Sequence, residues 1–313
     1  MVRSEMPKTK KRILLLIGAA HTPRWDKKCQ AIAEYLDSSR YEVAISSLLD
    51  LVYFTSIGEC AVYDPQAGWD IADFDLVVFR AINEQEDLAV AAAAYLRQRG
   101  VRYIDARIPQ RGKHKLECAF VRVEHGLPVP PTLYTRAALL PEAFSRAGLA
   151  FPAVVKASNG RKGRDNYKVD SMVQLQKIVS EGEHKFVVQP LIPNEGDYRV
   201  LVYNGRIEFA FLRTAAPGTH LNNTSRGGAA YIIDAQRKFS KQMQADIVRA
   251  AAVDRLQIAG VDVLCDAHTG QHYILEVNSS PQLSDGVFAE AHMRPYSALL
   301  ASLAEGQEIV YEN

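Results

Sequence analysis

An alternation of strand-like and helix-like segments through the first hundred residues constrains the fold most. Strands are predicted over residues 13–17, 41–45, 75–79 and 101–104, with helices over residues 26–36 and 86–99. Continuous apolar runs such as 13–17 are typical of parallel strands that are covered on both faces. Gly100 follows the second helix in the position where glycine commonly ends helices. The alternation predicts an open parallel α/β domain over residues 1–108, with helices on both faces of its sheet.

The remaining two thirds of the chain mix helices with antiparallel strands. The predicted elements are helices over 113–125, 173–179 and 240–258, a C-terminal helix, and strands over 151–157, 186–189, 198–202, 207–212, 261–265 and 273–277. Asn204-Gly205 between two of these strands is the strongest short-range signal for a β-hairpin. A second hairpin is expected where the last two strands meet.

Composition excludes some classes of protein. The 313 residues carry 37 Lys and Arg against 36 Asp and Glu, a formal charge of +1, so a nucleic-acid partner is not expected. No run reaches the ~18 to 20 apolar residues that a membrane span needs. Basic residues before the run 13–20 resemble a signal peptide, but the run is short and opens the strand–helix pattern, so we favour a buried strand. Four scattered cysteines favour reduced thiols and a cytoplasmic location.

The predicted C-terminal hairpin carries two acidic residues. If the loop between its strands is residues 268–270, with Gly270 in the left-handed conformation, Asp262 lies opposite Glu276 and Asn278 shares their face. Facing carboxylates repel each other, and a divalent cation with oxygen ligands, such as Mg²⁺, relieves that repulsion. An exposed strand edge or an arginine partner would also relieve it, so the hairpin alone leaves the metal open.

Lys156 lies in the otherwise apolar segment 151–157. Because burying an ammonium without a partner is costly, this lysine is expected to face an anion. The loop that follows, residues 158–166 (SNGRKGRDN), places Gly160 and Gly163 where backbone N–H groups can approach a phosphate. Neither a P-loop nor a dinucleotide fingerprint is present. A polar turn is the plain alternative for this loop, and a solvated surface lysine is the plain alternative for Lys115.

Arginines follow in two further segments. Alternation along the strand predicts that Asp197 and Arg199 share one face, with Tyr198, Val200 and Val202 on the other. Arg213 ends the next strand, and Arg226 lies in a loop that contains Asn222 and Asn223. Arginines beside a carboxylate-bound metal suit phosphoryl oxygens, whereas surface ion pairs are the bland alternative.

Taken in order, these segments resemble the ATP-grasp superfamily and, within it, the RimK-type ligases. The segments that carry the resemblance are 187–200 (VVQPLIPNEGDYRV), 222–228 (NNTSRGG), 259–263 (AGVDV) and 275–281 (LEVNSSP). It covers about residues 110 to 305 and implies an α/β ATP-grasp fold. Residues 1–108 would form the N-terminal α/β domain, and 109–190 and 191–308 would form two α+β subdomains that clamp the nucleotide.

The resemblance also implies a role for each matched residue. ATP and Mg²⁺, with Mn²⁺ as an alternative metal, would be the cofactors. The metal would be bound by Asp262, Glu276 and Asn278; the nucleotide by Lys115, Lys156, Gly160, Gly163, Gln189, Pro190, Leu191, Asp197, Asn222 and Asn223; and the transferring phosphoryl group by Arg199, Arg213 and Arg226. The resemblance implies that the loops 158–166 and 214–228 close over the site as lids. Two departures from the family pattern bear on this closure: Asp165 and Gln282 stand where family members often have glycine.

The implied reaction joins a carboxylate to an amine. The carboxylate would attack the γ-phosphate of ATP, and an amine would then attack the acyl-phosphate. Transfer of phosphate to a hydroxyl, nucleotide binding without turnover, and a plain α/β binding protein are the alternatives. The substrates, small molecules or peptides, are expected at the carboxyl ends of the first strands, near His21, Arg24 and Arg80. Neither their identity nor the oligomeric state, a homo-oligomer included, follows from the sequence.

Overall fold

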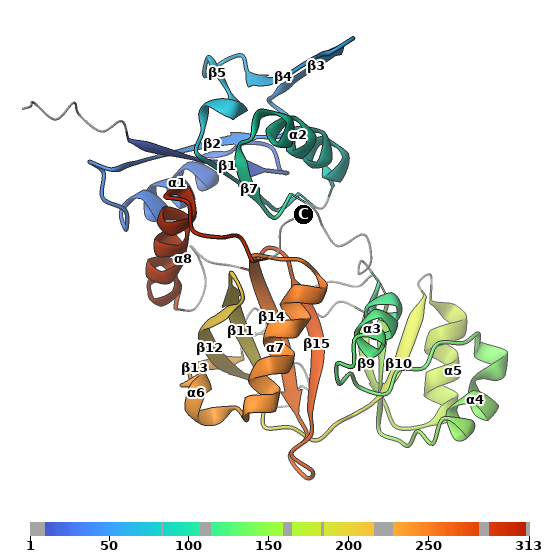
Figure 1. Cartoon of the computed structure of the whole chain (residues 1–313). Helices are drawn as coiled ribbons and strands as arrows, with labels where there is room; N and C mark the ends of the chain where they lie inside the picture. Colours follow the sequence, from blue (N-terminus) through green and yellow to red (C-terminus); the bar gives the residue numbers. More distant parts are fainter. Residues whose placement is uncertain are drawn as a thin grey trace, which may run out of the picture.

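The computed structural model of the chain describes most of its residues. The described ranges are 10–82, 84–106, 114–158, 165–182, 185–215, 228–281 and 288–310. Within these ranges the strands form four sheets, and three of them are the centres of three packed units (Figure 1).

The first unit is built on a parallel sheet, as predicted. Its strands are β1 (Lys11–Ile17), β2 (Tyr41–Ser47), β6 (Leu76–Arg80) and β7 (Arg102–Ile104), in the order β2-β1-β6-β7. Alternate residues of β1 point to opposite faces of the sheet and pack into two different hydrophobic cores. Ile13 and Leu15 pack beside α1 (Pro23–Ala33), while Leu14 and Leu16 pack beside α2 (Glu86–Arg99). The sheet is therefore covered on both faces, which explains why β1 is a continuous apolar run.

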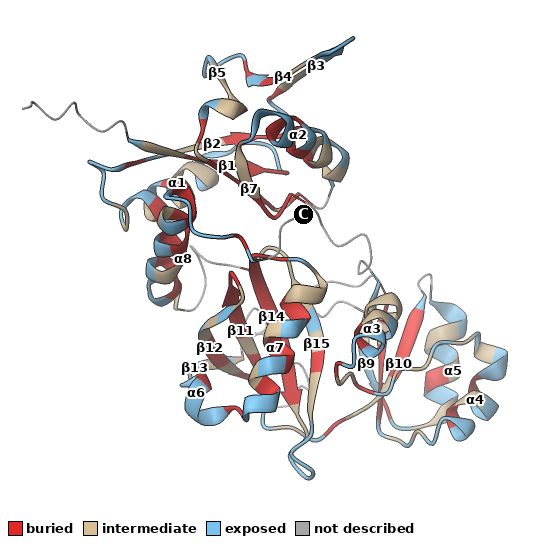
Figure 2. Ribbon diagram, in the orientation of Figure 1, coloured by how far each residue is buried: buried red, intermediate tan, exposed pale blue. Residues whose placement is uncertain are grey.

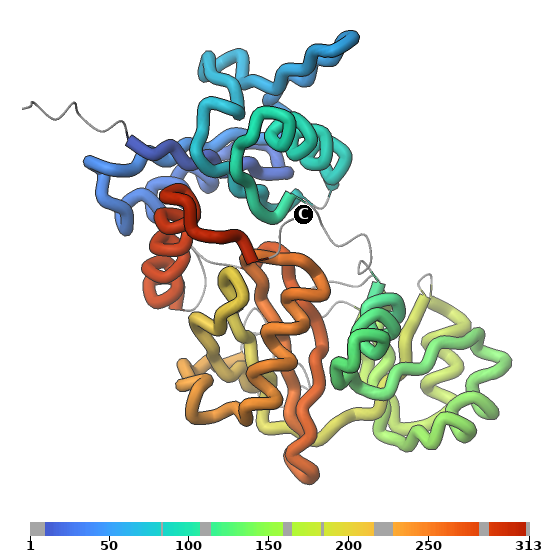
Figure 3. Tube along the Cα trace, viewed as in Figure 1, coloured from blue at the N-terminus to red at the C-terminus, as the bar shows by residue number. Residues whose placement is uncertain are grey.

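The C-terminal helix α8 (Ala289–Ala304) also packs on this first sheet. Its Met293, Tyr296 and Leu300 share a core with Ile32 of α1 and Leu15 of β1. Figure 3 shows the red end of the chain beside the blue N-terminal unit. The division at residues 108 and 190 stays a prediction, and the packing of α8 joins the two ends of the chain into one core.

A small antiparallel meander was not anticipated. β3 (Val52–Ser56), β4 (Glu59–Asp64) and β5 (Trp69–Asp70) form a separate three-stranded sheet, which the short 3₁₀ turn η1 (Ile71–Asp73) connects to β6. Asp70 and Asp73 cap this turn reciprocally. The Asp70 side chain accepts from the Asp73 backbone N–H, and the Asp73 side chain accepts from the Asp70 backbone N–H. The strand–helix alternation gave no reason to expect strands between residues 46 and 75.

The second unit has a three-stranded antiparallel sheet. Its strands are β8 (Ala153–Ala157), β9 (Asn166–Val169) and β10 (Phe186–Pro190), in the order β10-β8-β9. Its helices are α3 (Lys115–Glu124), η2 (Ala137–Leu139), α4 (Leu140–Arg146) and α5 (Met172–Glu181). Helices α4 and α5 pack on one face of the sheet through Leu140, Phe144 and Leu175. The strands and helices predicted in this region are confirmed within a few residues.

The third unit is a five-stranded antiparallel sheet. Its elements are β11 (Asp197–Tyr203), β12 (Arg206–Thr214), β13 (Ala229–Ile232), β14 (Ile258–Cys265) and β15 (His272–Asn278), with helices α6 (Ala235–Lys238) and α7 (Lys241–Val253). The strand order is β13-β12-β11-β14-β15. Asn204 and Gly205 form the predicted turn, both with positive φ, at 43° and 79°. Strand β13 was not predicted.

Helix α7 covers one face of this sheet. Ser240 caps it, as expected, by accepting a hydrogen bond from the Met243 N–H. The helix ends at Val253, not at residue 258, because Ile258 opens β14 and pairs with Tyr203. Figure 2 shows the buried strands of this sheet behind the helix. The opposite face of the sheet carries the polar residues described next. Among the described residues, no helix combines the length and apolar character that crossing a membrane requires.

Candidate active site

The acidic hairpin has the predicted pairing but a different turn. Asp262 of β14 lies opposite Glu276 of β15. The connection spans residues 266–271 instead of three residues, and Gly270 in it has a φ of +73°. A bulge next to Asp262 leaves Leu275 without a partner and restores the expected register. The prediction that the two carboxylates face each other is therefore confirmed.

Asn278 completes the group at the end of β15. It lies opposite Gly260, and its Nδ2 donates to the Gly260 carbonyl at 3.1 Å. A Cβ at Gly260 would lie 2.9 Å from the Cβ of Pro281 and 3.3 Å from the Cδ of Arg199. Only glycine lets the segment after β15 and the Arg199 side chain approach β14 this closely. Glycine inside a strand is a signal for such an approach, but the strand predicted over residues 261–265 began one residue after Gly260, whereas β14 begins at Ile258.

Two arginines bind the carboxylates of this face. Arg199 donates to both oxygens of Asp262, through Nε and, at 2.8 Å, through Nη2. Arg213 binds Asp197 with two bonds of 2.8 and 2.9 Å and also places Nη2 3.1 Å from Asp262 Oδ2. These partners face each other across neighbouring strands, because Arg199 pairs with Asp262 and Asp197 pairs with Arg213 in the register. The predicted common face of Asp197 and Arg199 is confirmed.

The arginines set the ionisation of the buried carboxylates. Burial alone would raise the pKa of Asp262, but Arg199 and Arg213 outweigh burial and hold it below its usual value. Burial dominates at Asp197 and raises its pKa to about 6 despite Arg213. The carboxylates in turn raise the pKa of Arg213 against the effect of burial. Asp262 and Arg213 are therefore charged at neutral pH.

Glu276 lies in a different environment from Asp262. Its side chain is exposed, yet desolvation by the surrounding protein raises its pKa, and the charge of Asp262 adds to the rise. Lys115 and Arg199 oppose that rise. No hydrogen bond to the Glu276 carboxylate is found within the described ranges, so its oxygens are accessible from the open side of the sheet.

Lys156 faces the acidic hairpin from the second unit. Its Nζ donates to Gln189 Oε1 at 2.8 Å, and Gln189 Nε2 donates to Thr132 Oγ1 at 2.8 Å. Burial, followed by the charge of Lys115, lowers the pKa of Lys156 to about 8, while Glu276 and Asp197 oppose the shift. In the part of the chain that the structure describes, no carboxylate hydrogen-bonds to this ammonium. Thr132 was not predicted, since nothing in a Pro-rich segment marks one threonine as the support of a distant glutamine.

Lys115 stands at the start of α3, and its backbone N–H donates to the Ser158 carbonyl at 2.9 Å. Burial lowers the pKa of Lys115, and Glu276 counters this. Glu276 therefore acts electrostatically on both lysines. The structure brings together the predicted lysines, carboxylates and arginines of the described ranges at one site.

Other predicted nucleotide residues have mixed outcomes. Pro190 pairs with Ala153, and the Leu191 N–H donates to the Pro152 carbonyl at 3.0 Å. Gly160, Gly163, Asn222, Asn223, Arg226 and Gln282 lie outside the described residues. Asp165 has a φ of +51°, a conformation that explains why glycine suits this position and that aspartate adopts more readily than most residues.

The N-terminal residues named as substrate ligands behave differently from one another. Arg80 is buried and donates to the carbonyls of Ser279, at 3.4 Å, and Pro281, at 3.0 Å. It therefore joins the end of β6 to the segment just after Asn278; of the two open interpretations, a clamp for a substrate carboxylate or a solvated arginine, the solvated one does not hold. His21 binds Asp26 at 2.8 Å on the surface, and Arg24 is exposed beside it.

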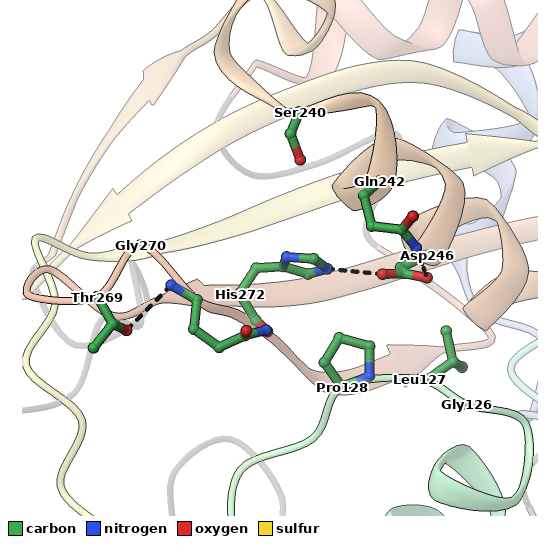
Figure 4. Close-up of a pocket in the computed structure, with 10 residues that line it drawn as sticks. Gly126, Leu127, Pro128, Ser240, Gln242, Asp246, Thr269, Gly270 and His272 are labelled. Atoms are coloured by element: carbon green, nitrogen blue, oxygen red, sulfur yellow. Dashed lines mark hydrogen bonds and ion pairs between the residues drawn. The ribbon is translucent and has the colours of Figure 1, made fainter.

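The third unit also carries a polar hollow of about 540 Å³ on its other side, between α7, the β14–β15 turn and residues 126–128. Figure 4 shows His272 pointing from β15 toward Asp246 of α7. The buried Asp246 accepts from Gln242 at 3.1 Å, Arg249 at 2.6 Å and His272 at 3.0 Å. Because these groups satisfy one another and lie on the α7 side, we assign them to holding α7 against β15 and not to the active site.

Comparison with known proteins identifies the family. Residues 112–289 match the family model described as the RimK-like ATP-grasp domain, which is more than half of the chain. The chain belongs to the RimK-like ATP-grasp family. A probable alpha-L-glutamate ligase of Aeromonas salmonicida (strain A449) is 29% identical over 259 residues, which is 80% of each chain.

Solved structures agree with this family. A RiPP-associated ATP-grasp ligase of Chryseobacterium gregarium, in complex with ADP and a leader and core peptide, has a TM-score of 0.70 at 12% identity and covers 97% of this chain and 99% of its own. The ATP-grasp ligase PsnB, complexed with a phosphomimetic variant of its minimal precursor, Mg and ADP, has a TM-score of 0.68 at 16% identity, covering 93% and 98%. The predicted ATP-grasp fold is confirmed, and so is the prediction of a RimK-type ATP-grasp ligase, an enzyme that forms C–N bonds.

Proposed function

We propose that this ATP-grasp ligase activates a carboxylate as an acyl-phosphate and transfers it to an amine, using ATP and Mg²⁺. One observation carries the proposal. The accessible Glu276 and the charged Asp262 face Lys156, whose ammonium has an amide as its hydrogen-bond partner. A metal-bound polyphosphate supplies a cation for the open Glu276 carboxylate, beside an Asp262 that Arg199 and Arg213 already bind, and an anion for the lysine.

The side chains at the hairpin suit a hard divalent cation. Asp262, Glu276 and Asn278 offer two carboxylates and an amide, which is the oxygen chemistry that Mg²⁺ prefers. When bound, the cation would neutralise charge on the transferring phosphoryl group. Arg199 and Arg213 keep Asp262 ionised and fix the orientation of its carboxylate before any ligand binds.

The lysines would hold the phosphates from the opposite side. Lys156, with a pKa of about 8, is mostly protonated at neutral pH and pays little further desolvation cost on meeting an anion. Gln189, which Thr132 holds in turn, positions the Lys156 ammonium. Lys115 would contribute a second positive charge, and Pro190 and Leu191 would flank the adenine. We keep Asp197 as a candidate near the ribose, although in this structure its oxygens bind Arg213.

We place the carboxylate and amine substrates between the first and third units. A cavity of about 210 Å³ lies there, lined by residues of β1, β2, α1 and α8 and by Arg80, Ser280 and Pro281. Because Ser280 and Pro281 are the second and third residues after Asn278, we place this cavity beside the proposed metal site. One named relative is a probable alpha-L-glutamate ligase, and the two named structures are complexes with a leader and core peptide or with a variant of a minimal precursor, which supports an amino acid or a peptide as substrate. We place the reaction in the cytoplasm, in keeping with four free cysteines.

An ADP-release screen tests the proposal. Purified protein with ATP and Mg²⁺ is offered pools of amino acids and short peptides, and the products are analysed by mass spectrometry. Amine-dependent ADP release with an amide-linked product is the expected result. Phosphate retained on the product would instead identify a kinase. ADP release without any substrate-dependent product would contradict the ligase assignment.

A further inference from the structure

The cavity between the first and third units lies where the strand order of the parallel sheet reverses. In the order β2-β1-β6-β7, the chain continues from β1 to β2 on one side and returns to β6 on the other. Ile17 ends β1, Arg80 ends β6, the two residues are register partners, and both line the cavity. Open α/β sheets bind their ligands outside the carboxyl ends of the strands at such a point. The position of the cavity therefore favours a ligand site.

The wall of this cavity is mostly apolar. Leu15 of β1, Ile32 of α1 and Met293 of α8 line it and are at most 4% exposed. Trp25 and Ile45 also line it and are partly exposed. An apolar cavity of about 150 Å³ is large enough to hold benzene. At about 210 Å³, this cavity therefore has room for a branched aliphatic side chain.

Arg80 places a buried positive charge in this apolar wall. It is 8% exposed, and its hydrogen bonds go to the neutral carbonyls of Ser279 and Pro281. No carboxylate in the described part of the chain forms an ion pair with it. Burial raises the pKa of Asp105, after the adjacent strand β7, to about 7 against the effect of Arg80, so Asp105 compensates this charge only in part. A guanidinium has five N–H donors, so Arg80 can keep both carbonyls and also bind a carboxylate.

Lys28 adds a second positive charge where the cavity wall is partly exposed. It lies one turn after Trp25 on α1, and its ammonium is 4.6 Å from the centroid of the Trp25 ring. The described residues that line the cavity include neither Asp nor Glu. An apolar body with one anionic group is therefore the ligand chemistry that this wall complements.

We propose that the cavity selects an amine substrate with an apolar side chain and a free carboxylate, that is, an amino acid of the leucine class. This assignment rests on the proposed function, which supplies the acyl-phosphate that the amine attacks. The side chain would pack on Leu15 and Met293, and the carboxylate would bind Arg80. Nearby cations favour the neutral amine, which is the nucleophile, over its ammonium. A glutamate side chain would bring a second carboxylate against aliphatic groups at a desolvation cost.

Calorimetric titration of the full chain tests the proposal with three probes: leucine, leucinamide and glutamate. Each is titrated without nucleotide and again with a nonhydrolysable ATP analogue and Mg²⁺. Leucine should bind at least about tenfold more tightly than glutamate, whose side-chain carboxylate is desolvated, and than leucinamide, which lacks the carboxylate.

The two tryptophans of the chain show where leucine binds. Trp25 lines the cavity, whereas Trp69 packs on Phe74 at the β3–β5 meander. Leucine should change the fluorescence of Trp69→Phe, which keeps Trp25, and leave that of Trp25→Phe unchanged. A signal that persists only in Trp25→Phe would overturn the assignment to this cavity.

Charge variants test the carboxylate contact. Arg80→Met should weaken leucine binding at least about tenfold and abolish the preference for leucine over leucinamide. Lys28→Gln should weaken it by about threefold, since its charge is partly exposed. Lys27→Gln is the matched control, because Lys27 is an exposed neighbour on α1 that does not line the cavity. Thermal unfolding checks the fold of each variant, and Lys28→Gln carries the test if Arg80→Met is unstable.

Leucine that fails to bind under either condition would overturn the proposal, as would equal binding of glutamate or leucinamide, or equal losses in Lys27→Gln and Lys28→Gln. In the products of the ADP-release screen, an apolar residue should carry a free carboxylate. Leucine binding without amine-dependent ADP release would contradict the ligase function and keep the cavity assignment. Amine-dependent ADP release with glutamate alone would keep the ligase function and contradict the selection proposed here.

Discussion

The two walls of the proposed active site differ in how their charges are satisfied. On the wall of the third unit, Arg199 and Arg213 bind Asp262 and Asp197, and three of these four side chains are buried. On the wall of the second unit, Lys156 has Gln189 as its hydrogen-bond partner. One wall is electrostatically balanced without a ligand, whereas the other gains its counter-charge when a ligand binds.

This difference separates stability from function. Removing one member of a buried ion network leaves its partners buried and uncompensated, which costs folding free energy. Removing the half-buried Lys156, which has no carboxylate hydrogen-bond partner in the described part of the chain, relieves a desolvation cost, so it should impair binding while sparing the fold. Substitutions on each side of the site test this difference.

Arg213→Met should have the largest effect on stability. It leaves the buried Asp197 and Asp262 without the guanidinium that they share, so the free energy of unfolding should fall by about 3–5 kcal/mol. Denaturant unfolding measures it. The matched change Arg199→Met should cost less, because Asp262 keeps Arg213 and Arg199 is partly exposed. Equal losses in the two variants, or none in Arg213→Met, would contradict the balanced network.

Glu276→Gln should have the largest effect on turnover. Losing one of the two facing carboxylates should slow ADP release by at least about a hundredfold, the range found when a single electrostatic group of a transition state is removed. Because Glu276 faces Asp262, stability should be unchanged or slightly higher. Steady-state kinetics and thermal unfolding are measured together. Cys265→Ser, on the neighbouring strand, should keep nearly full activity, and full activity in Glu276→Gln would remove the metal assignment.

Lys156 should give nucleotide binding a pH dependence. Its pKa of about 8 in the free protein means that the ammonium is present below pH 8 and is lost above it. Affinity for an ATP analogue should therefore be constant below pH 8 and weaken by up to about tenfold per pH unit above it. Calorimetric titration from pH 6.5 to 9.5 measures this. Lys156→Arg, which stays charged, should lose the dependence, and a variant that keeps it would assign the titration to another group.

Asp165→Gly should have the smallest effect. The change removes a carboxylate beside the expected phosphate loop and places glycine at a φ of +51°. A charge interaction of about 1 kcal/mol in a solvated site corresponds to a roughly fivefold gain in nucleotide affinity. Asp165→Asn separates the two contributions, since it removes the charge and keeps the side chain. A weaker affinity in both variants would show that Asp165 assists binding.

The sequence predicted which side chains share the site better than it predicted the turns and long-range contacts that hold them there. Alternation and register brought Asp197, Arg199, Asp262 and Glu276 to one face, because side chains along a strand follow a strict period of two. The short turn predicted for the hairpin was wrong, and the bulge at Leu275 corrected the register. Local patterns do not reveal bulges of this kind.

Contacts between residues far apart in the chain could not be predicted from local sequence patterns. Arg80 was predicted only as a candidate substrate ligand or a solvated arginine, whereas its burial depends on carbonyls some two hundred residues later in the chain. The Thr132–Gln189–Lys156 chain and the packing of α8 on the first sheet have the same origin. The β3–β5 meander was missed because short ribbons without intervening helices give a weak periodic signal.

The dependence of nucleotide affinity on Mg²⁺ tests the central claim most directly. A nonhydrolysable ATP analogue is titrated calorimetrically into the wild type and into Glu276→Gln, with and without Mg²⁺. If the nucleotide phosphates lie between Lys156 and the Asp262–Glu276 pair, Mg²⁺ should tighten binding to the wild type by at least about tenfold, a difference of about 1.4 kcal/mol. Most of that gain should be lost in Glu276→Gln. An equal gain in both proteins, or none in the wild type, would contradict the account.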